Sequence, residues 1–315
     1  MNVNDNDIAR TSKCPMAVDM IDAMEGLSGI HPGYRRAHAK GACYRGVFHP
    51  SGEAAPYTTA PHLQGGAVDA IVRFSGNSSD PALGDLLSPA KGLAVQFQLP
   101  GDVNTSLVGV TFPVFFVRTP ESLLDLVRAV NEARAGQLSV LDMFKEAAEH
   151  FSESKRSLLE IKRLLPPASY ATNRYFTIHV FYLVAADGRR RPVKFEWMPD
   201  AGIETLSLIE AAERPADYLE QEMTDRLQRG PVSFTLQIVL GEPGDPTDDS
   251  TMPWPEERER LDAGRLVIEA AIHEPPGLLM DPTAVVDGVE LSDDPILHFR
   301  HSAYAESYLR RNDSR

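Results

Sequence analysis

Tyr304 stands out near the end of the chain because Arg300 lies four residues before it. Residues four apart share one face of a helix, so the guanidinium group of Arg300 can face the phenol oxygen. A free phenol ionises near pH 10 and only the phenolate binds metals well, so a permanent cation beside it favours the metal-binding form. Arg311 returns to roughly the same face and can pair with a carboxylate. The alternative is an ordinary amphipathic helix with arginines near its C-terminal end.

A second candidate for chemistry is His38 in the segment Arg35-Arg-Ala-His38-Ala-Lys-Gly41, just before an expected strand. Neutral imidazole near pH 7 can accept a proton and return it. The segment Val72-Arg73-Phe74-Ser75 follows some thirty residues later. A lone histidine is more often a surface residue or a satisfied core residue, which is how we interpret the remaining histidines.

The overall composition is that of a globular protein with a sizeable core. The chain has 315 residues, of which 43% are hydrophobic and 24% charged, and a formal net charge of -14. The negative charge argues against nucleic acid or an anionic membrane as the main partner. Cys14 and Cys43 have no C-x-x-C spacing, so neither a disulfide framework nor a structural zinc site is indicated. The polar N-terminus shows no signal or membrane segment, which predicts a cytoplasmic protein.

The periodicity predicts two groups of four strands separated by helices, which suits an antiparallel barrel with a helical insertion. Residues 1–15 are expected to form a flexible tail and residues 16–315 a single domain. The expected strands are Gly41 to Phe48, Val68 to Ser75, Leu93 to Leu99, Leu107 to Phe116, Tyr175 to Val184, Pro192 to Trp197, Val232 to Leu240 and Gly264 to Ala271. Helices are expected over Ala17 to Gly26, Pro120 to Ala135, Val140 to His150, Glu153 to Leu165 and much of Leu206 to Arg229.

Six ordered motifs together resemble those of haem catalases, and most of all the small catalase-related peroxidase branch. The resemblance covers Tyr34 to Arg311, and agreement of six motifs in order is far more specific than any one of them. The motifs are Arg35-x-x-His38-Ala-Lys-Gly41, Val72-Arg73-Phe74-Ser75, Pro89-Ala-Lys-Gly92-Leu-Ala-Val-Gln-Phe97, Leu107-Val-Gly109, Pro113-Val-Phe115-Phe116 and Arg300-x-x-x-Tyr304.

The resemblance implies an α+β fold, namely an eight-stranded antiparallel β-barrel with helical insertions and a C-terminal helix on the proximal side of haem b. By the same resemblance, His38 is the distal acid/base and Ser75 the hydroxyl that orients it. Tyr304 is the axial ligand of the haem iron, an identity that is a general property of catalases. The residues expected around the haem are Arg300 beside the phenolate, Arg35, Arg73 and Arg311 on the two propionates, and Phe115 against the porphyrin. No nucleotide cofactor is expected, because the chain lacks the glycine-rich nucleotide motifs.

The sequence departs from the larger catalases at positions that bear on the reaction. The position three residues before Pro113, an asparagine in those enzymes, is Val110, which cannot hydrogen-bond a peroxide oxygen. Ala305-Glu-Ser307 replaces the usual Pro-Asp-Thr. The sequence ends soon after the expected proximal helix, so if the chain forms a homo-oligomer we expect smaller contacts than in full-size catalases.

These features predict a haem b peroxidase that reduces hydrogen peroxide or organic hydroperoxides with an unidentified organic donor, with weak or no catalase activity. One alternative is a hydroperoxide-rearranging enzyme of the catalase-like allene oxide synthase type, which would consume its substrate without a donor. Another is a non-catalytic haem-binding or haem-sensing protein, which the apolar Val110 would suit.

Overall fold

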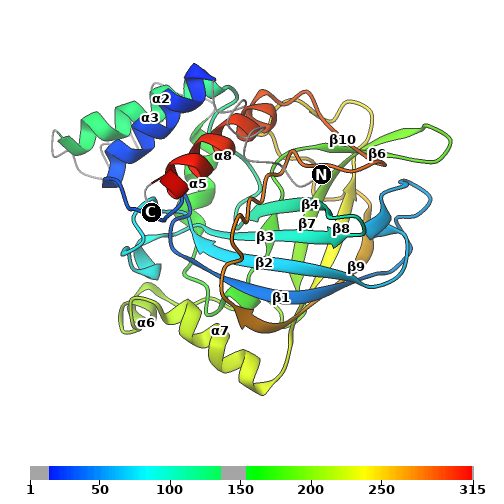
Figure 1. Cartoon of the computed structure of the whole chain (residues 1–315), viewed down its shortest axis with the longest axis horizontal. Helices are drawn as coiled ribbons and strands as arrows, with labels where there is room; N and C mark the ends of the chain where they lie inside the picture. The colour runs from blue at the N-terminus through cyan, green and yellow to red at the C-terminus, as the bar shows by residue number, and fades with distance from the viewer. Residues whose placement is uncertain (1–13, 136–153, 314–315) are drawn as a thin grey trace.

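The structure is a computed structural model that describes residues 14–135 and 154–313. In these ranges the chain forms one antiparallel sheet of ten strands with helices packed outside it (Figure 1). The strands are β1 (Gly41–Pro50), β2 (Val68–Gly76), β3 (Lys91–Leu99), β4 (Val103–Val110), β5 (Tyr175–Phe176), β6 (Phe181–Val184), β7 (Arg190–Pro199), β8 (Val232–Leu240), β9 (Arg260–Ile272) and β10 (Val289–Leu291).

Eight of these strands close into a barrel. The hydrogen-bonded order runs β1, β2, β3, β4, β5, β7, β8 and β9, and β9 pairs again with β1. Strand β6 pairs with the first part of β7, whereas β5 pairs with a later part of the same strand. Strand β10 pairs with β6. Closure satisfies the backbone groups that an open sheet would leave at its edges. The predicted eight-stranded antiparallel barrel is therefore confirmed.

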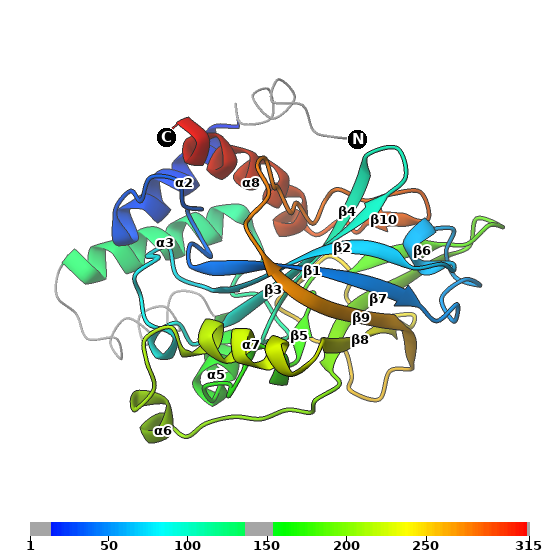
Figure 2. The same cartoon turned by 60° about the horizontal axis from the view of Figure 1, so that its bottom comes forward.

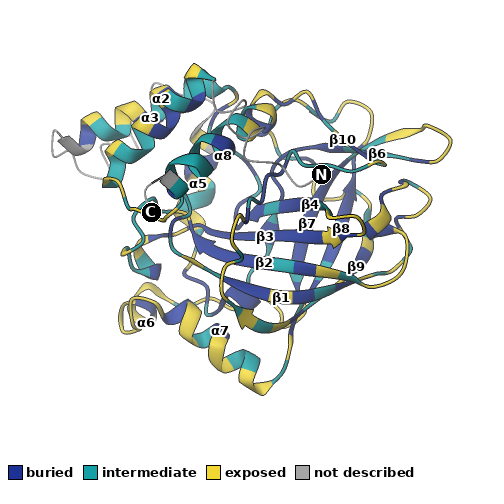
Figure 3. Ribbon diagram, viewed as in Figure 1, coloured by how far each residue is buried: buried dark blue, intermediate teal, exposed yellow. Residues whose placement is uncertain are grey.

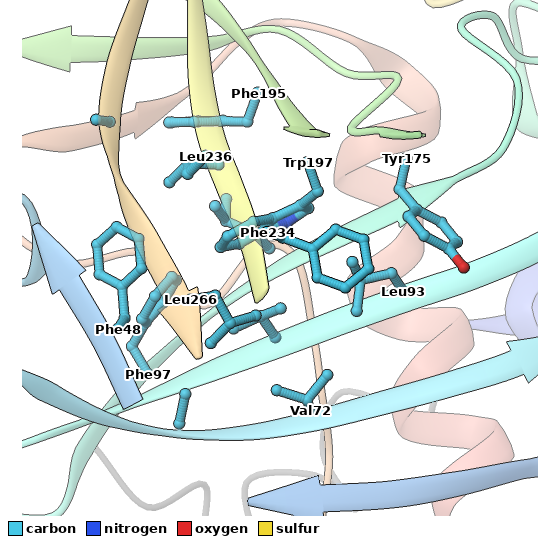
Figure 4. Packing of buried hydrophobic residues seen from close by; sticks show 14 of the residues in the cluster. Phe48, Val72, Leu93, Phe97, Tyr175, Phe195, Trp197, Phe234, Leu236 and Leu266 are labelled. Atoms are coloured by element: carbon cyan, nitrogen blue, oxygen red, sulfur yellow. The ribbon is translucent and has the colours of Figure 1, made fainter. Parts of the chain in front are cut away.

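The barrel interior is filled by side chains that alternate along the strands. In β8, the buried residues Val232, Phe234 and Leu236 alternate with the more exposed Ser233 and Thr235. Large rings from other strands meet them inside the barrel, as Figure 4 shows for Phe48, Phe97 and Trp197 around Phe234. Such alternation is what a sheet with one buried face requires. This part of the barrel is a packed core, so the polar groups expected to do chemistry must lie at its end or outside it.

The helices gather in two groups on different sides of the barrel (Figures 1 and 2). One group contains α2 (Pro15–Ser28), α3 (Pro120–Ala135) and α8 (Pro295–Asp313), where Met20 and Leu124 pack together with Phe299. The other contains α6 (Leu208–Ala212) and α7 (Tyr218–Arg229), while α5 (Ser154–Arg163) lies against the segment that follows β4. Their outer faces are exposed and their inner faces buried (Figure 3). Short 3-10 turns are η1 (Pro61–Leu63), η2 (Asp85–Leu87) and η3 (Tyr170–Thr172).

Two of the expected strands are wrong in detail. The strand predicted over Leu107 to Phe116 instead runs from Val103 and stops at Val110, because Pro113 has no N–H to continue a ladder. The strand predicted over Tyr175 to Val184 is divided into β5 and β6. Between them Thr177 exchanges both backbone and side-chain hydrogen bonds with Phe195.

Other expectations fall partly or wholly outside the described residues. The helix predicted over Val140 to His150 lies outside them, as do residues 1–13 of the predicted tail, whereas Pro15 already begins α2. No helix within 14–135 and 154–313 is long and apolar enough to cross a membrane. In the same ranges, no three His, Cys, Asp or Glu side chains are grouped to hold a metal ion.

The buried histidine His62 gives the fold a predictable dependence on pH. Its ring stacks on Phe97 with centroids 4.6 Å apart, and burial lowers its pKa to about 4. Because the unfolded chain binds this proton near pH 6.5, the stabilisation is complete above about pH 6.5 and is lost as pH falls toward 4.

Between pH 7.5 and 5.0, the free energy of unfolding of the wild-type chain should fall as His62 in the unfolded state takes up a proton. We expect the fall in His62→Leu to be smaller by about 2 kcal/mol. Urea unfolding of both proteins at the two pH values measures this difference. His49→Leu, at an exposed position of β1, is the control and should leave the wild-type pH dependence in place. Equal losses in all three proteins would show that His62 does not stay neutral in the folded state.

Candidate active site

One row of residues crosses the end of the barrel where the predicted catalytic groups lie. Gly41 in β1 is opposite Ser75 in β2, Ser75 is opposite Gly92 in β3, and Gly92 is opposite Val110 in β4. Val110 in turn is opposite Phe176 in β5. The strand register therefore brings Ser75 and Val110 to the same end of the barrel, although 35 positions separate their numbers.

His38 lies next to this row, in the loop that leads into β1. Its Nδ1 is 3.0 Å from Ser75 Oγ, so the serine hydroxyl holds one nitrogen of the ring. A Cβ on Gly92 would be 2.7 Å from Ser75 Oγ and 3.0 Å from His38 Nδ1, so only glycine leaves room for this pair. His38 also has a backbone φ of 53°, a left-handed conformation that costs an L-residue about 1 kcal/mol. The loop is thus held in a strained shape that aims the ring at the barrel end.

The surroundings of His38 keep its ring neutral. Burial, followed by the positive charges of Arg73, Arg300 and Arg35, lowers its pKa to about 3. At neutral pH the ring therefore carries no charge and its free nitrogen can accept a proton. The C-terminal helix α8 lies against this loop, because Arg36 donates to Ser307 Oγ and to the Arg310 oxygen.

Three predicted haem arginines converge on a carboxylate that the sequence did not single out. We call Arg35, Arg73 and Arg311 the arginine cluster. Glu274 Oε2 is 2.5 Å from Arg35 Nη1 and 3.5 Å from Arg73 Nε, and its Oε1 is 2.9 Å from Arg311 Nη1. Partial burial acts to raise the pKa of Glu274, but the bond from Arg35 and the charges of the cluster hold it below its ordinary value.

Arg73 connects the arginine cluster to the His38 loop. Its Nη2 donates to the backbone oxygens of His38 at 2.9 Å and Ala39 at 3.2 Å. A Cβ on Gly41 would lie 2.7 Å from this nitrogen, which explains why glycine begins β1. The same side chain therefore belongs to the cluster and fixes the backbone that carries the candidate base.

Tyr304 and Arg300 lie on α8 as the four-residue spacing predicts. Arg300 Nη1 is 3.4 Å from the Tyr304 hydroxyl oxygen, a long hydrogen bond. The guanidinium group of Arg300 also lies over the ring of Phe115, 5.5 Å from its centroid. Phe115, Arg300 and Tyr304 thus form one contact set on the helix side of the site.

Two residues behind Arg300 belong to the same environment and were missed by the sequence analysis. His179 Nδ1 is 2.6 Å from Asp294 Oδ2, and burial together with the charge of Arg300 lowers the pKa of His179 to about 4. The other oxygen of Asp294 accepts hydrogen bonds from the backbone N–H groups of Ile296 and Leu297 at the start of α8. His179 and Asp294 are 115 positions apart and carry no shared motif, so only the fold could reveal the pair.

A network of ion pairs holds α8 against the loop that carries His38. Glu25 of α2 accepts hydrogen bonds from Arg36 Nε at 2.6 Å and from Arg310 Nη1 at 2.8 Å. Arg36 also reaches α8 directly, through the Arg310 oxygen and through a bond from its own N–H to Ser307 Oγ. These contacts fix the distance between the two segments that carry His38 and Tyr304.

Val110 lies in an apolar cluster at the barrel end. It is 9% exposed and packs with Ala90, Phe112 and Ile178. No side-chain hydrogen bond can come from this position, although it stands in the same strand row as Ser75.

Comparison with known proteins identifies the family of this chain. The catalase family profile matches residues 19–314. The chain belongs to the catalase family. Members similar to it include a protein of Mycolicibacterium paratuberculosis named catalase-related peroxidase, 36% identical over 92% of this chain and 93% of that protein. Another of that name, from Synechococcus elongatus, is 33% identical over 93% of this chain and 87% of that protein.

Longer catalases share the fold over part of their length. A bacterial catalase structure superposes with a TM-score of 0.79 at 23% identity, over 88% of this chain and 57% of the other. The chain likewise spans 60% of a catalase of Ipomoea batatas, with 28% identity. The superposition shows that this chain has the fold of the longer catalases.

The catalase family implies a haem-type cofactor, and the residues at the barrel end fit such a group. The arginine cluster carries three guanidinium groups against one carboxylate, which leaves positive charge for the two propionates. Among the described residues, the Nε atoms of Arg73 and Arg300 are buried without a hydrogen-bond partner. Tyr304 adds a phenol oxygen beside a cation.

Proposed function

We propose that the chain is a haem b peroxidase that reduces hydrogen peroxide or organic hydroperoxides with an organic electron donor and has weak or no catalase activity. One observation carries the proposal: Arg36, two residues before His38, bonds Ser307 Oγ and the Arg310 oxygen of α8, the helix that carries Tyr304 and Arg300. The candidate metal ligand and the candidate proton acceptor therefore share one site. The two relatives named catalase-related peroxidase, each aligned over more than nine tenths of this chain, support the same reaction class.

In this proposal the cofactor is held from two directions. Tyr304 would bind the iron through its phenol oxygen, which Arg300 Nη1 approaches at 3.4 Å as a permanent positive charge. The arginine cluster binds the propionates through planar guanidinium groups, which suit carboxylates. Bound haem supplies the redox chemistry that cleaves the oxygen–oxygen bond and accepts electrons from the donor.

His38 moves the proton that this cleavage requires. With a pKa of about 3 its ring is neutral at neutral pH, so it can take the proton from the hydroperoxide O–H. It then returns that proton to the departing oxygen, which leaves as an alcohol or as water. Ser75 keeps Nδ1 engaged and so leaves Nε2 to face the substrate.

Val110 favours the peroxidase reaction over oxygen release from two molecules of hydrogen peroxide. A valine cannot donate a hydrogen bond to a peroxide oxygen or hold a water in place. Its apolar neighbours Ala90, Phe112 and Ile178 make this wall of the site suitable for the hydrocarbon part of an organic hydroperoxide or donor.

Replacing the proposed iron ligand tests the cofactor assignment. Tyr304→Phe should weaken haemin binding by more than about a hundredfold, because loss of outer-shell partners alone costs ten- to a hundredfold in metal sites. Titration of the haem-free chain with haemin, followed by absorbance, measures this. Tyr308→Phe, one helical turn further along α8, is the matched control. Equal affinity in the two variants would reject Tyr304 as the ligand.

Replacing the proposed base tests the mechanism separately. His38→Ala should still bind haemin but react with a hydroperoxide at least about a hundredfold more slowly, the scale of a lost general acid or base. The rate is the initial spectral change after rapid mixing. Exposed His49→Ala serves as the control, and a wild-type rate in His38→Ala would remove this residue from the mechanism.

Restoring an amide at the end of β4 tests the reaction preference. Val110→Asn should raise the rate of oxygen release from hydrogen peroxide by about tenfold or more, since one well-placed donor has effects of at least this size. An oxygen electrode measures the release. Val108→Asn, two residues back in the same strand, is the control. No increase over that control would mean that Val110 does not set the preference.

A further inference from the structure

Glu274 is the point at which three distant parts of the chain meet. It lies two residues after the end of β9, while its partners come from the His38 loop, from β2 and from α8. The three ion pairs span 2.5 to 3.5 Å. Its side chain is 34% exposed, whereas those of Arg73 and Arg311 are 6% exposed, so the carboxylate stands at the outer side of a largely buried group of cations.

The guanidinium groups are also held in place without Glu274. The backbone oxygen of Leu278 accepts from Arg311 Nη2 at 3.1 Å and from Arg35 Nη2 at 3.5 Å, and Arg73 is bound to the His38 loop. Removal of the carboxylate would therefore leave three like charges close together. Burial, together with the charges of Arg35 and Arg311, lowers the pKa of Arg73 to about 10, the direction expected for like charges held close together.

The charge of the group is suited to a dianion. Three guanidinium groups at +1 and one carboxylate at −1 give +2, which two propionates would balance. Without Glu274 the group would carry +3, so each propionate would meet one more uncompensated charge. Without Glu274, the haem-free chain would also lose the carboxylate that contacts all three guanidinium groups.

We propose that Glu274 is a positioning residue, the resident counter-ion that stabilises the arginine cluster before haem binds and sets its charge to that of two propionates. The proposal rests on the proposed function, because it takes haem as the dianion. It implies opposite effects on two measurable quantities. Loss of the Glu274 charge lowers the stability of the haem-free chain and raises its affinity for haemin.

The experiment compares Glu274→Gln with the wild-type full-length chain. We expect the Tm of the haem-free variant to fall by about 2 °C or more, followed by circular dichroism. Its affinity for haemin, from absorbance titration, should rise about fivefold, which corresponds to about 1 kcal/mol. Glu274→Asp keeps the charge and should return both quantities toward the wild-type values. A purely structural role would lower Tm and leave the affinity unchanged.

Glu269→Gln is the matched control, because Glu269 of β9 carries the same charge in an exposed pair with Arg45 of β1, outside the cluster. Any result in which Glu274→Gln resembles Glu269→Gln in Tm and affinity overturns the role of Glu274 alone. A fall in haemin affinity in Glu274→Gln also overturns it, because the carboxylate would then assist the cofactor directly. If the wild-type chain takes up no haemin, both this proposal and the proposed function fail.

Discussion

The candidate site depends on the ion pairs that hold α8 against the loop carrying His38. Arg36 and Arg310 share the carboxylate of Glu25, which ties the loop, α2 and α8 into one unit. Buried or partly buried pairs of this kind are costly to break, because each remaining charge loses its partner. These contacts set the separation between the proposed proton acceptor and the proposed metal ligand, because His38 lies in a loop and Tyr304 in α8, both outside the barrel strands.

The rest of the site consists of positive charge placed close to groups that must stay neutral or become negative. Arg300 contributes to three environments: it bonds the Tyr304 oxygen, covers Phe115 and depresses the pKa values of His38 and His179. A cation in this position keeps a nearby imidazole unprotonated. Asp294 adds a negative charge next to His179, with which it forms a hydrogen bond, and it also caps the start of α8.

Much of the site could be predicted from local sequence. The four-residue spacing of Arg300 and Tyr304 is a property of any helix, and the structure shows the expected contact. The barrel follows from strand alternation and from ordered motifs that resemble those of a known family, which the family comparison confirms. The extent of the strand after Gly109 was predicted wrongly, because apolar residues continue past Val110, where the ladder ends.

The sequence by itself determined the types of chemical group, the helix that carries Tyr304 and the membership of the chain in its family. The tertiary structure alone decided which charges meet. Glu274 follows β9 and belongs to no motif, and its three arginine partners lie between 37 and 239 positions away. His179 and Asp294 are likewise 115 positions apart in the sequence. Such pairs depend on strand register and on helix packing, and no local spacing encodes either, because both arise from contacts between segments that are far apart in the chain.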